Sequence, residues 1–179
     1  MSPILATCAC LLAQGATETP SPPAEPDGPT VRFVYIGSSH CGGCKAPGLR
    51  QALADARDAA RRWAEEHGYA FVHTGVSTDV ELDRGWQFLA DNGRFDEVLI
   101  GRGWLNQGIV AFVASFPDDP LALFGEPQLV VLIEDHRFGR DKIQTLGPPR
   151  AVFRSLGSLI PRHATPENVR AALDAALEK

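Results

Sequence analysis

The sequence lacks the features that define several large classes of protein. Its one N-terminal apolar run, Ile4–Ala13, is too short to span a bilayer as a helix. Its 17 Lys and Arg are outnumbered by 22 Asp and Glu, and no basic face is evident, which argues against nucleic-acid binding. Four cysteines in 179 residues are too few for a disulfide scaffold. What is present, 44% apolar and 22% charged residues, is typical of one globular domain with a full hydrophobic core.

The first 30 residues are expected to lie outside that domain. Residues 1–15 contain the apolar run and end in a small-x-small pattern typical of a secretory signal, but no Lys or Arg precedes Arg32, so the segment resembles a truncated signal. Residues 16–30 hold five prolines and no large apolar residue, which predicts an extended linker. We expect a periplasmic or otherwise exported protein, with the cytoplasm as the alternative. Because Leu5-Ala6-Thr7-Cys8 also resembles a lipoprotein box, the alternatives include a membrane tether through the N-terminus.

Strand and helix signals alternate along residues 31–179 and predict an α/β domain. Strands are expected at 31–36, 69–77, 98–100, 129–133 and 142–146, with a turn at 135–139. Helices are expected from 44 to about 67, at 79–92, at 105–116 and after the start signal Thr165-Pro166. Trp63 and Trp86 share the apolar faces of the first two helices and are expected in the core.

One group of residues points to chemistry, a Cys-x-x-Cys directly after the first expected strand. Cys41 and Cys44 are separated by two glycines, and a helix is expected to follow. A thiolate at a helix start is stabilised by free N–H groups and the positive end of the helix dipole, which lowers a cysteine pKa below about 8.5. The spacing lets the second thiol attack a mixed disulfide formed by the first. We therefore expect Cys41 to be the exposed nucleophile and Cys44 the more buried resolving thiol.

The order of these motifs resembles that of the thioredoxin-like superfamily. The shared features are the strand VRFVYIG, the CGGC-Lys turn, the long helix, the strand YAFVHTGVS, Pro127 before QLVVLI, a hairpin and a C-terminal helix. The resemblance covers residues 31–178. It implies a thioredoxin-like α/β fold, with a central mixed β-sheet flanked by helices and a helical insertion at about 79–125, as in the larger periplasmic members. Within that insertion, Arg102, Trp104, Asn106 and Gln107 either line the substrate groove or serve packing alone.

The same resemblance implies a function and a set of site residues. In this superfamily a cis-proline opens the strand beside the active site, and Pro127, preceded by Glu126, is the matching position. Pro127, Glu126 and His40 are accordingly expected to contact the substrate. The implied activity is that of a thiol–disulfide oxidoreductase without cofactor or metal, whose partners are protein thiols and disulfides and a redox partner protein. The chain departs from thioredoxins by having His40 in place of Trp and Tyr35 in place of a buried acid.

Two alternatives stay open at this stage. The cysteine pair could hold Cu(I) or zinc, with His40 or His73 as a further ligand, or the domain could be a non-catalytic interaction scaffold. The remaining residues of metal-binding type, Glu134, Asp135 and His136, are expected to lie at a solvated hairpin tip. The direction of exchange, as oxidase, reductase or isomerase, is left undetermined because the Gly-Gly spacer adds no charge to the motif.

Overall fold

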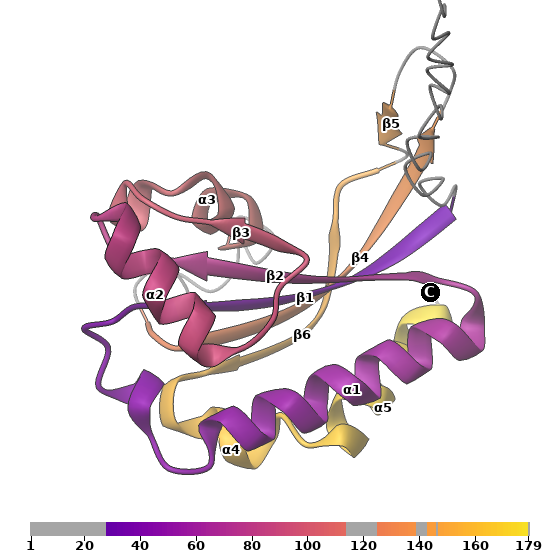
Figure 1. Ribbon diagram of the computed structural model, residues 1–179. Coiled ribbons are helices and arrows are strands. Elements are labelled where there is room, and N and C mark those ends of the chain that lie inside the picture. Colours follow the sequence, from indigo (N-terminus) through magenta and orange to yellow (C-terminus); the bar gives the residue numbers. More distant parts are fainter. Residues whose placement is uncertain (1–27, 114–124, 139–142, 146, 179) are drawn as a thin grey trace, which may run out of the picture.

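The structure is a computed structural model that describes residues 28–113, 125–138, 143–145 and 147–178. The signal-like segment, most of the proline-rich linker and the end of the expected insertion lie outside these ranges. The described chain is an α/β domain with one mixed sheet (Figure 1). Its first strand begins at Gly28, earlier than the expected start at Val31, because Gly28 to Thr30 already pair with the strand beside it.

Within the described residues the sheet has six strands, with the order β3-β2-β1-β4-β5 and with β6 also paired to β4. The strands are β1 (Gly28–Gly37), β2 (Ala70–Ser77), β3 (Glu97–Leu99), β4 (Gln128–Phe138), β5 (Ile143–Thr145) and β6 (Arg150–Leu156). The first three run parallel, and β4 runs antiparallel to β1 and to its other two neighbours. The carboxyl ends of β1 and β2 therefore meet the start of β4 at one edge of the sheet.

Helices cover both faces of the sheet (Figure 1). They are α1 (Leu49–His67), α2 (Leu82–Asn92), α3 (Gln107–Val113), α4 (Ile160–His163) and α5 (Pro166–Leu177). On one face, side chains of α1, α2, α4 and α5 pack against alternate residues of β1 and β4, around the fully buried Trp63. On the other face, Ile109 and Phe112 of α3 pack against the intervening residues of the same strands. This alternation is the period of two that buried strands impose.

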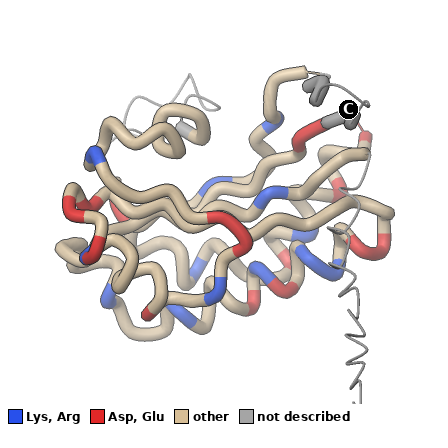
Figure 2. Tube along the Cα trace, turned by 45° about the horizontal axis from the view of Figure 1, so that its top comes forward, with Lys and Arg blue, Asp and Glu red and all other residues tan. Residues whose placement is uncertain are grey.

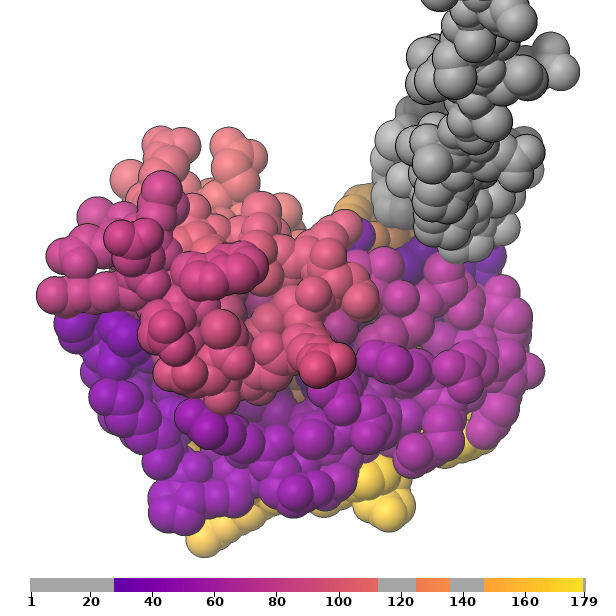
Figure 3. Space-filling model, in the orientation of Figure 1, coloured from indigo at the N-terminus to yellow at the C-terminus, as the bar shows by residue number. Residues whose placement is uncertain are grey.

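The elements between β2 and β4 gather at one end of the molecule. In Figure 3 the pink surface of α2, β3 and α3 lies next to the indigo surface of the chain that follows β1. The helix expected at 79–92 is shorter in the structure, because α2 begins only at Leu82.

Two expectations about individual elements are wrong, and one strand was not expected. Trp86 is 60% exposed, because Gly85 takes the inward position of α2, where a side chain would collide with Ile100. The turn expected at 135–139 is instead a continuation of β4 as far as Phe138. The sequence analysis also missed β6, whose residues are mostly half-buried and so lack a clear hydrophobic alternation.

Candidate functional site

The Cys-x-x-Cys motif lies between the end of β1 and the start of α1, but not on α1 itself. Cys44 belongs to a short 3-10 turn, η1 (Gly43–Lys45), and α1 begins only at Leu49. The helix expected to start at Cys44 is delayed because Pro47 favours an extended residue before it, and Ala46 has ψ 137°. The positive end of the long helix is therefore not directly at the cysteines. The local stabilisation of the Cys41 sulfur comes from the backbone N–H of Cys44, which lies 3.0 Å away.

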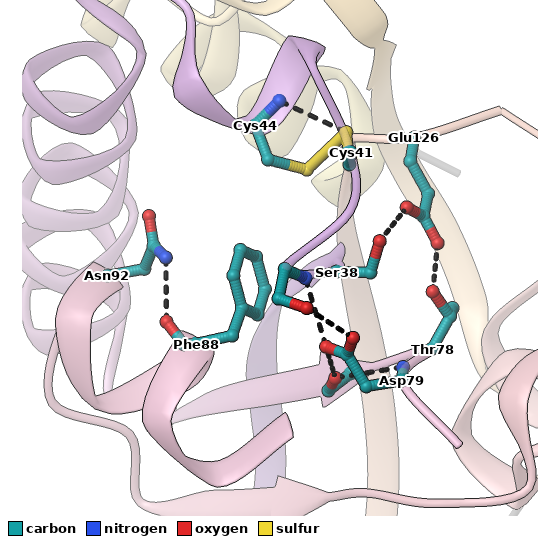
Figure 4. Close-up of a disulfide and its surroundings, with 10 residues drawn as sticks. Ser38, Cys41, Cys44, Thr78, Asp79, Phe88, Asn92 and Glu126 are labelled. Atoms are coloured by element: carbon teal, nitrogen blue, oxygen red, sulfur yellow. Dashed lines mark hydrogen bonds between the residues drawn. A yellow bond between two sulfur atoms is a disulfide. The ribbon is translucent and has the colours of Figure 1, made fainter. Parts of the chain in front are cut away.

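The two cysteines form a disulfide whose sulfurs differ in exposure (Figure 4). Cys44 is 4% exposed and packs into the core, whereas Cys41 is half-buried and borders it. Gly37, the last residue of β1, leaves room for the buried Cys44 sulfur, because a Cβ at this position would lie only 2.9 Å from that sulfur. The structure thus gives the two sulfurs the unequal access that was expected of a nucleophile and a resolving thiol.

The Glu126–Pro127 segment at the start of β4 lies against the motif. The peptide bond between the two residues is cis, and Pro127 is buried. An added side chain on Gly43 would meet Pro127 Cδ at 2.8 Å and the carbonyl oxygen of Glu126 at 3.3 Å. Tertiary contact therefore joins residues about 85 positions apart in the chain.

The carboxylate of Glu126 is directed at the side chains of Ser38 and Thr78, whose two hydroxyl groups hold it (Figure 4). Ser38 Oγ donates a hydrogen bond of 2.7 Å to one carboxylate oxygen, and Thr78 Oγ1 donates to the other. A carboxylate oxygen of Glu126 and the sulfurs of Cys41 and Cys44 all lie within 4.8 Å of one another. The site therefore combines two sulfurs with an oriented carboxylate.

A second carboxylate, Asp79, fixes the loop that leads into the motif. It is 3% exposed and accepts hydrogen bonds from Ser39 N at 3.0 Å, Ser39 Oγ at 2.6 Å and Ser77 Oγ at 2.8 Å. Burial acts to raise the pKa of Asp79, but the hydrogen bonds from Ser39 and Ser77 outweigh burial, and the pKa is lowered. The ionised Asp79 thus holds the chain between β1 and Cys41 in place.

Tyr35 lies beneath the motif on β1. A Cβ added to Gly37 would lie 2.9 Å from the Cys44 sulfur and 3.1 Å from Tyr35 Oη. The phenol of Tyr35 is therefore close to Cys44. Tyr35 is 1% exposed, and its hydroxyl has no hydrogen-bond partner among the described residues. Burial, reinforced by the negative charge of Glu126, raises the pKa of Tyr35 above its ordinary value. The group beside Cys44 is therefore a neutral phenol.

Two grooves flank the motif. One, with a volume of about 410 Å³, opens beside Glu126 and is bordered by Ser38, His40, Thr78, Asp79, Trp104 and Arg84. The other, of similar volume, reaches Cys44 between Lys45, Arg50 and Phe88. Figure 2 shows Lys and Arg interspersed with Asp and Glu along the chain.

The structure brings together most, but not all, of the residues singled out in the sequence. Cys41, Cys44, Glu126 and Pro127 meet at one point. His40 is an exposed neighbour of Glu126 on the first groove, with Nε2 3.8 Å from an Asp79 oxygen. Of the insertion residues considered, Trp104 borders that groove, whereas Asn106 is buried and bonds Gly101 and Gly108.

The other candidates lie elsewhere. His73 packs between Phe33 and Phe95, and burial lowers its pKa to about 4, so it is a core histidine rather than a ligand at the cysteines. Glu134 is a strand residue that accepts a 2.9 Å hydrogen bond from Arg32, and the solvated hairpin tip expected at 134–136 is wrong. The sequence analysis missed Ser38, Thr78 and Asp79, whose only signal was their position at the carboxyl ends of two neighbouring strands.

Comparison of the chain with protein-family models, with curated proteins and with solved structures gives no match. None of the helices in the described ranges is long and apolar enough to cross a bilayer. The fold and the geometry of the site are therefore the basis for assigning a function.

Proposed function

We propose that the protein catalyses thiol–disulfide exchange on protein substrates through Cys41 and Cys44. The observation that carries this proposal is the disulfide itself, which has one accessible and one buried sulfur and lies against the Glu126–Pro127 segment. The mixed sheet, the flanking helices and the position of Pro127 support a thioredoxin-like fold with residues 79–125 as an insertion. We place the protein outside the cytoplasm, because residues 1–15 resemble a secretory signal and disulfides persist in oxidising compartments.

In the oxidising direction, a substrate thiolate attacks the accessible Cys41 sulfur. The Cys41–Cys44 bond breaks, Cys44 leaves as a thiolate, and a mixed disulfide joins the substrate to Cys41. A second substrate thiolate then attacks the substrate sulfur of that bond and releases Cys41. Two electrons pass from the substrate dithiol to the cysteine pair, and the two substrate thiol protons pass to the solvent or to the released thiolates. A redox partner protein restores the disulfide by the reverse sequence.

The surroundings suit a polypeptide substrate. The groove of about 410 Å³ is bordered by Glu126 and by His40, the residue before Cys41. Glu126 and Pro127 also lie against Gly43 of the motif. In the disulfide form the Cys44 N–H lies 3.0 Å from the Cys41 sulfur, and we expect it to stabilise the Cys41 thiolate after reduction. We expect the exposed His40, which borders this groove, to contact the residue that precedes or follows the substrate cysteine.

Single cysteine variants test this proposal with a peptide that carries two cysteines. With Cys41→Ser, exchange should fall to the uncatalysed rate, and no mixed disulfide should form. With Cys44→Ser and the peptide supplied in its disulfide form, Cys41 should attack the peptide disulfide and release one peptide thiolate. The mixed disulfide should then accumulate and turnover should stop, because the resolving thiol is absent. Cys8→Ser is the matched control and should leave the rate unchanged, because Cys8 lies in the expected leader. Exchange that survives in Cys41→Ser would refute the proposal.

A further inference from the structure

We propose that the reduced protein binds one zinc ion through Cys41, Cys44 and Glu126. This goes beyond exchange, because it assigns a metal site to the dithiol state of the same pair. In the part of the chain that the structure describes, these three residues are the one group of metal-ligating side chains whose ligand atoms all lie within 4.8 Å of one another. Binding in this site requires the two sulfurs to move apart after the disulfide is reduced, and the carboxylate to approach them, until all three reach the spacing of a tetrahedral zinc site.

The carboxylate is the part of the site that is already built. Ser38 and Thr78, which are 6% and 8% exposed, each donate a hydroxyl hydrogen bond to a different oxygen of Glu126. Each carboxylate oxygen can accept two hydrogen bonds or one bond and a metal, so both oxygens keep an acceptor position. Donors of this kind orient a ligating carboxylate in metal sites. These two bonds hold a carboxylate oxygen within 4.8 Å of both sulfurs before any metal arrives.

The ligand set selects the metal. Two thiolates with one carboxylate suit zinc, which accepts sulfur and oxygen together. Mg²⁺ and Ca²⁺ prefer oxygen ligands alone, and Cu(I) is satisfied by soft thiolates without a carboxylate. Three protein ligands leave a fourth position open, and the groove of about 410 Å³ beside Glu126 gives that position access to water or to a substrate group.

The histidines considered from the sequence are not part of this site. His73 is packed between two phenylalanine rings, and His40 Nε2 lies near Asp79 and, at 3.4 Å, near Arg84. The third ligand is therefore Glu126, and not the histidine considered from the sequence.

Zinc binding in this site is limited to one redox state. The sulfurs of the disulfide are bonded to each other and carry no thiolate charge. After two-electron reduction, each thiol releases its proton to the solvent and forms a bond to zinc. Oxidation of the pair breaks both bonds and releases the ion. Zinc would thus compete with disulfide substrates for the reduced enzyme.

The test is a zinc titration of the full chain, reduced with a phosphine and competed with a chromophoric chelator, in parallel with the oxidised protein. We expect one zinc per reduced chain and none per oxidised chain. Glu126→Gln should weaken binding by about tenfold or more, with Glu126→Asp in between. Glu81→Gln is the matched control, since Glu81 is an exposed carboxylate of the same region, paired with Arg84, and should bind zinc as the wild type does. Thermal unfolding of each oxidised variant confirms that the fold is intact.

Cobalt provides the second readout, because thiolate-to-cobalt charge-transfer absorption reports sulfur ligation directly. Absence of stoichiometric zinc in the reduced wild type would overturn the inference, as would unchanged affinity in Glu126→Gln. Equal binding of Cu(I) by wild type and Glu126→Gln, with no zinc bound, would also overturn it in favour of a two-thiolate copper site. Peptide exchange by the metal-free protein is measured alongside, so failure of the zinc site is distinguished from failure of the proposed exchange.

Discussion

Replacing Gly43 by alanine should destabilise the protein, whereas the same replacement at Gly42 should not. The two spacer glycines look equivalent in the sequence, but their surroundings differ. Gly42 has helical dihedral angles (φ −63°, ψ −39°), and nothing lies within 4 Å of an added Cβ. An added Cβ on Gly43 would lie 2.8 Å from Pro127 Cδ and 3.3 Å from the carbonyl oxygen of Glu126. Both neighbours are ring or backbone atoms, so neither can rotate away.

The expected magnitudes follow from these contacts. Alanine at Gly42 restricts the unfolded chain without strain and should stabilise the protein by about 0.4–1 kcal/mol. At Gly43 the same gain is opposed by overpacking, which costs about 1–3 kcal/mol. The free energies of unfolding of the two variants should therefore differ by about 1–3 kcal/mol, with Gly43→Ala the less stable.

Urea unfolding of the oxidised wild type and of both variants measures this difference. Gly43→Ala should also slow peptide exchange, because the added methyl group pushes the Glu126–Pro127 segment away from the cysteines. Gly42→Ala should leave the exchange rate close to that of the wild type. If the two variants are equally stable, the close packing of the motif against Glu126–Pro127 is refuted.

Three further predictions concern buried polar groups. Tyr35→Phe removes a buried hydroxyl that has no partner among the described residues, so the free energy of unfolding should rise by about 1 kcal/mol, and a decrease in urea unfolding would contradict this. Asp79→Asn should lower the free energy of unfolding at pH 7 by about 1–3 kcal/mol, because it weakens the two hydrogen bonds that the Asp79 carboxylate accepts from Ser39. Because the folded pKa of Asp79 is lowered, the ionised carboxylate stabilises the wild type above about pH 4, and that contribution is lost as the pH falls through the folded pKa, so the two proteins should converge in acid. His73 has a folded pKa of about 4 against about 6.5 unfolded, so wild-type stability should fall between pH 6.5 and 4, and His73→Gln should flatten that part of the pH profile.

The architecture could be predicted where local patterns were strong. Strands and helices alternate with clear periods, and the capping of α5 follows its sequence signal, since Thr165 accepts a hydrogen bond from Asn168 N. Prediction failed where a single glycine or proline overrode the apolar pattern. Gly85 turned α2 so that Trp86 faces outward, and Pro47 moved the start of α1 away from Cys44.

The site was also predictable only in part. Cys41 and Cys44 are close in the sequence, and their Cys-x-x-Cys spacing by itself indicates a redox or metal-binding pair. Pro127 and Glu126 were found through a family resemblance, which gave their place but not the direction of the Glu126 side chain. The hydroxyls of Ser38 and Thr78 could not be found at all, because their role depends on the pairing of β1, β2 and β4, which joins distant parts of the chain.

The equilibrium reduction potential of Cys41 and Cys44, measured against glutathione and dithiothreitol, tests the central claim most directly. The proposed exchange predicts a two-electron couple between about −120 and −270 mV that is absent from the Cys44→Ser variant. Its position in that interval would identify the protein as an oxidant or a reductant. A disulfide that neither reagent reduces, or a pair that never oxidises, would contradict the account.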